Sequence, residues 1–174
     1  DGMNTEGISA HALYMAGFCD YAAPAGTGND ISEMDVIAYL LGTCKNVAEA
    51  KSAAATLNVV GVDPGVGFVP PLHFLLHDAT ASIAIEFRPE GMSIVDNPCG
   101  VGTNPPFLDW HVTNLRNYVG ISAVTPTTTV HDTVLYPLGQ GGGLLGLPGD
   151  YTPPSRFVRA AALMLLIDQP ADAA

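Results

Sequence analysis

The feature that most constrains the fold lies between residues 72 and 96, where three apolar segments follow one another with short breaks. The segments are LHFLLHD (72–78), SIAIEFR (82–88) and MSIVD (92–96), separated at 78–81 and 89–91. Breaks this short cannot hold the crossover connection that parallel neighbours need, and they favour antiparallel pairing. The sequence therefore predicts a β-meander at the centre of the fold.

Two more segments have the composition of strands. The apolar run ISAHALYM (8–15) lies between Gly7 and Gly17 and predicts a buried strand. HDTVLYPL (131–138) is a second candidate, and the turn-rich stretch 61–71 connects the first half of the chain to the meander.

Helices are predicted in the remaining ordered segments. They comprise a helix that begins after Asn29 or Asp30 and ends at Gly42 as its C′ residue, a helix over 47–57 opened by a capping box of Asn46 and Glu49, a helix from Pro106 to Val119, and a helix capped by Thr152 with Pro153 and Pro154 in its first positions. Strand runs and helix runs are segregated along the chain. The predicted class is therefore α+β or a layered sheet sandwich, and not a βαβ alternation.

Composition excludes several classes of function. The 174-residue chain carries a net charge of −11 and only six lysine and arginine residues, which argues against a general nucleic-acid surface. Apolar residues make up 48%, enough for one domain with a sizeable core. No apolar run reaches the roughly 18 residues of a membrane span, so none is predicted. Cys19, Cys44 and Cys99 form no CxxC pair and are interpreted as free, buried thiols.

Two motifs fit cofactor or metal sites in spacing but not in context. Gly141, Gly143 and Gly146 match GxGxxG, yet Leu-Pro-Gly-Asp follows where a dinucleotide loop must open into a helix. His73 and His77 form HxxxH, but on a strand residues four apart are separated by about 13 Å, too far for one metal ion. No cofactor and no metal are therefore expected. A GxSxG elbow is also missing, which leaves an α/β-hydrolase without its nucleophile.

Three polar residues lie where loops meet regular structure. Asn104 precedes Pro105-Pro106, and its amide could donate to a developing oxyanion, although asparagine beside proline is common in turns. Tyr14 lies in an apolar strand, where a phenol usually packs and finds one hydrogen-bond partner. Arg156 falls in a first helical turn, where the helix dipole disfavours a cation, so we expect a specific partner to hold it.

Several long stretches of the chain are similar to one known family. DGMN with its following glycine, PLHFLLHD, SIAIEF, GVGTNPPFLDWHVTNLRNY and GLPGDYTPPSRFVRA closely resemble the choloylglycine hydrolase family of conjugated bile acid hydrolases and penicillin V acylases. The resemblance runs from Asp1 to about Ala162. It implies an N-terminal-nucleophile hydrolase: a four-layer αββα sandwich with antiparallel sheets, a nucleophilic cysteine exposed by processing, and commonly a homotetramer.

The resemblance also implies roles for the three polar residues. Asn104 matches the asparagine of the family's TN-x-P motif, an oxyanion donor, and Arg156 matches the arginine of its SRF motif, an active-site cation. Tyr14 falls on a variable polar position, where bile acid hydrolases tend to carry asparagine and some penicillin acylases tyrosine. This favours aryl-acyl amides as substrates. The glycines before Arg156 would let the loop pass close to the site.

The family's nucleophile, with the arginine and aspartate that accompany it, precedes the DGMN motif. We therefore expect residues 1–174 to be a partial domain, lacking N-terminal and C-terminal parts and inactive alone. The complete protein would cleave a small-molecule amide of the penicillin V, conjugated bile acid or N-acyl homoserine lactone type, and some family members are periplasmic or secreted. The alternative is a non-catalytic α+β binding or structural domain in which Asn104 and Arg156 serve as turn and packing residues.

Overall fold

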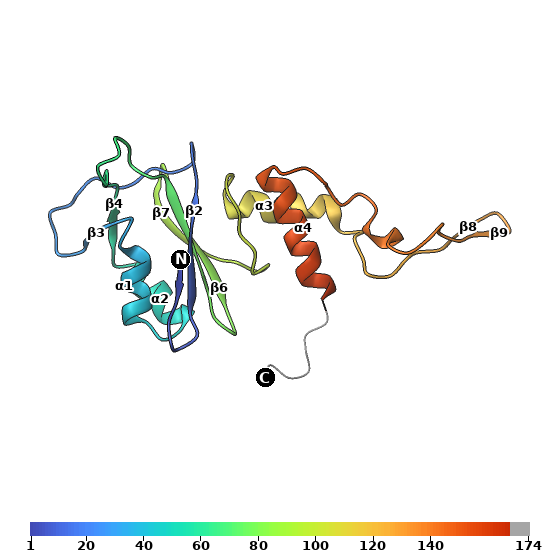
Figure 1. The fold of residues 1–174 in the computed structure, drawn as a ribbon, viewed down its shortest axis with the longest axis horizontal. Coiled ribbons are helices and arrows are strands. Elements are labelled where there is room, and N and C mark those ends of the chain that lie inside the picture. Colours follow the sequence, from blue (N-terminus) through green and yellow to red (C-terminus); the bar gives the residue numbers. More distant parts are fainter. Residues whose placement is uncertain (168–174) are drawn as a thin grey trace. The chain divides into compact units, whose positions relative to one another are not determined.

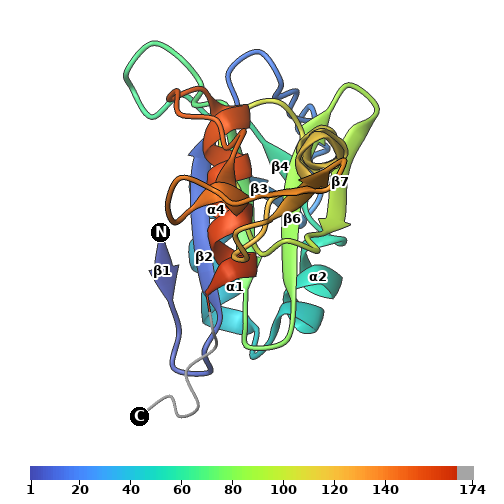
Figure 2. The ribbon, with the colours of Figure 1, turned by 90° about the vertical axis from the view of Figure 1, so that its right-hand side faces the viewer.

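The computed structural model describes residues 1–167, and the chain divides into two compact units, residues 1–108 and a second that begins at Asp109. The first unit contains a five-stranded sheet with the order β1-β2-β5-β6-β7. Its strands are β1 (Gly2–Met3), β2 (Ser9–Tyr14), β5 (Leu72–His77), β6 (Ser82–Arg88) and β7 (Gly91–Asp96), and every neighbouring pair is antiparallel. Figure 2 shows β1 beside β2 at one edge and β7 at the other. The predicted meander and the strand over 8–15 are confirmed.

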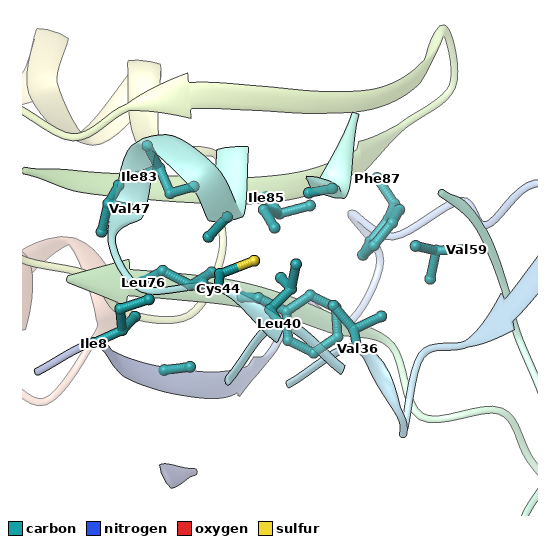
Figure 3. Close-up of a cluster of buried hydrophobic side chains, with 14 residues drawn as sticks. Ile8, Val36, Leu40, Cys44, Val47, Val59, Leu76, Ile83, Ile85 and Phe87 are labelled. Carbon is teal, nitrogen blue, oxygen red and sulfur yellow. The ribbon is translucent and has the colours of Figure 1, made fainter. Parts of the chain in front are cut away.

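Two short helices cover one face of this sheet (Figure 1). α1 (Val36–Thr43) and α2 (Val47–Ala54) contribute apolar side chains to a core with residues of β2, β5 and β6. Figure 3 shows Leu40 and Val47 of the helices against Leu76 and Ile85 of the sheet. Side chains alternate between the faces of a strand, so the core takes every second residue of the meander and leaves the others on the opposite face.

The helix ends differ in how well they match the prediction. The capping bond of Asn46 is confirmed, because its side chain accepts from the Glu49 main-chain amide at 2.9 Å. The reciprocal bond differs from that of a capping box, because the Glu49 side chain accepts from the amide of Lys45, one residue before the N-cap. The predicted start of α1 is wrong: residues 30–32 form β3 (Asp30–Ser32), which pairs in parallel with β4 (Asn58–Val60). Gly42 lies within α1 and is not its C′ residue. Because β3 and β4 run parallel, the expectation of antiparallel sheets is wrong for this two-stranded sheet.

The second unit is mainly helical. α3 (Leu108–Asn114) begins at the boundary between the units and continues into the 3₁₀ turn η1 (Leu115–Tyr118). A hairpin of β8 (Thr128–Val130) and β9 (Thr133–Leu135) follows, then η2 (Gly142–Leu144) and α4 (Pro153–Leu166). The rings of His111 and Phe157 stack with centroids 4.6 Å apart, which joins α3 to α4.

Predictions for this unit are confirmed in type and corrected in bounds. α3 starts at Leu108 and not at Pro106, and the strand predicted over 131–138 is β9 alone, preceded by a turn at His131. Thr152 is the N-cap of α4 but makes no capping hydrogen bond. Within residues 1–167, no helix is both long and apolar enough to cross a membrane.

Candidate functional site

The loop over residues 97–108 carries the candidate site residue Asn104 and lies against the face of the sheet opposite α1 and α2. At its start, the Asn97 amide donates to the Ser82 carbonyl at 2.8 Å. Further along, Gly102 lies so close to Leu75 that a Cβ at this position would be 1.8 Å from Leu75 Cδ1. Only glycine permits this approach, and the loop is therefore seated directly on the sheet.

Asn104 contacts the end of strand β2. Its Nδ2 donates a hydrogen bond to the main-chain oxygen of Tyr14 at 2.9 Å, across 90 positions of sequence. The acceptor is therefore the carbonyl of Tyr14 and not its phenol, and the residue as a whole is 49% exposed. The structure thus brings together two of the three residues singled out from the sequence.

A buried ion pair at the far end of this loop was missed by sequence reasoning. Glu86 on β6 is fully buried, and it accepts a hydrogen bond from Arg88 Nη2 at 2.8 Å and another from the Leu108 amide at 2.7 Å. The Arg88 guanidinium lies over the Phe107 ring, 4.2 Å from its centroid. The signal in the sequence was a glutamate in the otherwise apolar strand SIAIEFR, with an arginine two residues later on the same face.

Arg156 lies in the first turn of α4, in the second unit. Its Nη1 donates to the Tyr151 carbonyl at 2.6 Å, so the expected specific partner of this cation includes a main-chain oxygen. Asp150 lies in the loop before α4, and its carboxylate accepts hydrogen bonds from Thr152 and Ser155. These hydrogen bonds lower the pKa of Asp150 to about 2. The convergence of Asn104 and Arg156 on one cavity stays a prediction.

The glycine-rich loop makes a close approach within its own unit. A Cβ at Gly143 would lie 2.3 Å from the Ser122 carbonyl oxygen and 2.4 Å from that of Val124. The glycine at this position therefore permits contact with residues 122–124, and the longer helix α4 begins only at Pro153. This arrangement does not provide the loop-to-helix junction of a dinucleotide site.

The histidines and cysteines form no metal centre among residues 1–167, where no group of three potential ligands converges. His77 instead faces His11, with ring centroids 5.9 Å apart, and burial together with the His11 charge lowers the pKa of His77. Cys19, Cys44 and Cys99 are all free thiols, as predicted, although only Cys44 is fully buried. Burial raises the pKa of both Cys19 and Cys99, which disfavours the reactive thiolate.

Comparison with known families accounts for these features together. Residues 1–173 match the model of the linear amide C-N hydrolases, choloylglycine hydrolase family. The chain belongs to this family.

Relatives and solved structures agree with the assignment. The chain is 40% identical over 165 residues to a bile salt hydrolase/transferase of Lactiplantibacillus plantarum, covering 92% of this chain and 50% of the relative. A crystal structure of a variant conjugated bile acid hydrolase from Clostridium perfringens superposes with a TM-score of 0.85 at 35% identity, covering 97% of this chain and 55% of that one. Penicillin V acylase from Agrobacterium tumefaciens shares the fold, with a TM-score of 0.72 at 23% identity and coverage of 95% and 44%.

These matches also set the extent of the resemblance. The chain spans about half the length of the curated relatives it matches. The α+β class is confirmed, with the antiparallel five-stranded sheet matching the bile acid hydrolase fold over that half.

Proposed function

We propose that this chain forms the central part of an N-terminal-nucleophile amidase that cleaves a linear amide C–N bond through a cysteine acyl-enzyme. The single observation that carries the proposal is the bond from Asn104 Nδ2 to the Tyr14 carbonyl, which fixes a primary amide at the end of a central strand. The complete enzyme would form the four-layer αββα sandwich and assemble as a homotetramer. No cofactor is required by this chemistry.

The nucleophile is proposed to lie N-terminal to Asp1. Burial raises the pKa of Cys19 and Cys99, which disfavours their thiolates, and Cys44 is buried among apolar side chains. A side-chain cysteine within a chain also lacks the free α-amino group that serves as the base in this class of enzyme. An N-terminal cysteine exposed by processing would supply both groups.

Asn104 is proposed as the oxyanion donor. When the thiolate attacks the amide carbonyl, the carbonyl oxygen becomes an anion, and a preorganised donor stabilises it. Donation to the main-chain oxygen of Tyr14 holds this primary amide in a fixed orientation. The Tyr14 carbonyl would thereby orient Asn104. The resemblance of position 14 to penicillin acylases that carry tyrosine there favours an aryl-acyl amide such as penicillin V.

The proposed steps conserve atoms and charge. The thiolate sulfur forms a bond to the acyl carbon, the C–N bond breaks, and the leaving amine takes the proton held by the α-amine. Water then attacks the thioester carbon, releasing the carboxylic acid and regenerating the thiol. The anion that forms in each half-reaction would meet the same Asn104 amide.

The test compares the complete reading frame that contains this chain with its Asn104→Ala variant. One donor is worth about 10²–10³ in kcat, and KM should change little because the bond strengthens in the transition state. Asn29→Ala, a change of the same kind at an exposed residue, is the matched control. Penicillin V, a conjugated bile acid and an N-acyl homoserine lactone are the substrates assayed.

Three results would contradict the proposal. Hydrolysis of any of the three substrates by residues 1–174 alone, abolished by a thiol reagent, would place the nucleophile within this chain. A kcat of Asn104→Ala equal to that of Asn29→Ala would remove the asparagine from the reaction. Failure of the complete protein to hydrolyse any linear amide would favour the non-catalytic binding or structural domain.

A further inference from the structure

We propose that Glu86 is a positioning residue for Asn104, acting through the end of the 97–108 loop. The inference rests on the proposed function, since it concerns the amide that would stabilise the oxyanion. It goes beyond that function by assigning a role to a buried carboxylate that does not touch the reacting groups.

The complete burial of Glu86 indicates that specific partners stabilise its carboxylate. A carboxylate with no solvent exposure is tolerated only when it is paired and hydrogen-bonded. Its two oxygens have separate partners: Oε2 accepts from Arg88 and Oε1 accepts from the Leu108 amide. A charged acceptor makes a stronger bond than a neutral one, so the Leu108 main chain is firmly held.

Two consecutive loop residues are held by this ion pair. Glu86 holds the main chain of Leu108, while the guanidinium of Arg88 lies 4.2 Å from the centre of the Phe107 ring. The Phe18 ring also contacts the Phe107 ring in a T-shaped arrangement, with centroids 5.4 Å apart. The pair therefore fixes both the backbone and a side chain at the end of the loop.

Asn104 lies between this anchor and the one at Gly102. The contact of Gly102 with Leu75 precedes it by two residues, and the Leu108 bond follows it by four. With the Leu108 anchor removed, the segment that carries Asn104 would lose its fixed point on the C-terminal side. A misplacement of about 1 Å in a catalytic group can cost up to about 100-fold in rate.

The first test is made on the 174-residue chain, by NMR of the side-chain amide of Asn104. In Glu86→Gln the buried acceptor loses its charge, so the Leu108 amide proton should shift upfield and exchange faster. If Glu86 positions Asn104, the Asn104 amide signals should shift as well. Glu90→Gln, the same change at an exposed residue of the same hairpin, should move neither. A shift at Leu108 with none at Asn104 would overturn the proposal.

The second test uses the complete enzyme and separates this inference from the proposed function. Glu86→Gln should lower kcat by about 10-fold to 100-fold with KM little changed, as expected for a misplaced catalytic group. Phe107→Leu, which removes the ring under Arg88 and leaves Glu86 intact, should have a smaller effect in the same direction. If Asn104→Ala impairs kcat and Glu86→Gln behaves like Glu90→Gln, the positioning role is wrong and the proposed function stands. If Asn104→Ala is harmless, the proposed function itself fails.

Discussion

Asp78 ties the turn between β5 and β6 to the start of α2, and its replacement by asparagine should destabilise the first unit in a pH-dependent way. Its carboxylate accepts hydrogen bonds from the amides of Thr80 and Ala81 and, at 2.7 Å, from the amide of Val47. Val47 is the first residue of α2, where a main-chain N–H has no partner within the helix. Asp78, in a turn distant in the sequence, therefore accepts a hydrogen bond from a main-chain N–H at the start of α2.

The expected size of the effect follows from the pKa of Asp78. These bonds, the one from Val47 first, lower the pKa from 3.8 to about 2. Each unit of pKa difference corresponds to about 1.4 kcal/mol, but this carboxylate is partly exposed, and solvent screening reduces the contribution to about 1 kcal/mol. Asp78→Asn should lose about this much free energy of unfolding at pH 7.

The direction with pH follows because the folded state binds the proton less readily than the unfolded chain. The contribution is complete above the unfolded pKa of 3.8 and disappears as the pH falls toward about 2. Urea denaturation of wild type and Asp78→Asn at pH 7, 4 and 3 measures the difference between them, which at pH 3 should be about half its value at pH 7. Asp20→Asn, an exposed residue of the same unit, is the control.

A difference between wild type and Asp78→Asn that stays constant from pH 7 to pH 3 would refute this reasoning. It would mean that the asparagine disturbs packing and that the charge of Asp78 contributes nothing. A difference no larger than that of Asp20→Asn at pH 7 would show that the Val47 bond does not stabilise the folded state.

Two further substitutions test the loop and the second unit. Gly102→Ala should destabilise the first unit by about 1–3 kcal/mol, because its Cβ would overlap Leu75 at 1.8 Å, whereas Gly28→Ala, which meets nothing within 4 Å, should be nearly neutral in the same thermal unfolding assay. Arg156→Lys should lower kcat of the complete enzyme at least about tenfold, the equivalent of one charge-assisted hydrogen bond, because an ammonium lacks the planar fork of the guanidinium. A Lys variant with wild-type kcat would remove Arg156 from the reaction and leave it a structural role, which includes its contact with the Tyr151 carbonyl.

The parts of the fold that the sequence predicts are those determined by neighbouring residues. The meander follows from the short breaks at 78–81 and 89–91, and the start of α2 follows from Asn46 and Glu49. The parallel pairing of β3 with β4 could not be predicted in this way, because Asp30 and Asn58 are far apart in the sequence. In the structure, Asn58 Nδ2 donates to Asp30 Oδ1 at 2.6 Å. Asp30 resembles a helix cap in the sequence, but its carboxylate accepts from the amides of Ala25 and Gly26 and so closes a loop.

The candidate site was predictable to a similar extent. Asn104 and Tyr14 were found through motifs, since each stands at a distinctive junction of loop and regular structure. The contact between them through a main-chain oxygen could not be predicted, because any residue at position 14 offers the same carbonyl. The role of Glu86 could not be predicted, because the sequence of a strand does not show which loop packs against each face of the sheet.

The contact of Asn104 with the Tyr14 carbonyl makes the position of Asn104 independent of the side chain at position 14. Because Asn104 bonds to the backbone at position 14, the side chain there can change without moving the proposed oxyanion donor. The exposed phenol of Tyr14 is then available for contact with substrate, and its exchange for asparagine should alter substrate preference more than the rate of acyl transfer. Under the proposed function, substrate preference would vary at the end of β2, while the proposed anchors at Gly102 and Leu108 would keep the Asn104 amide in place.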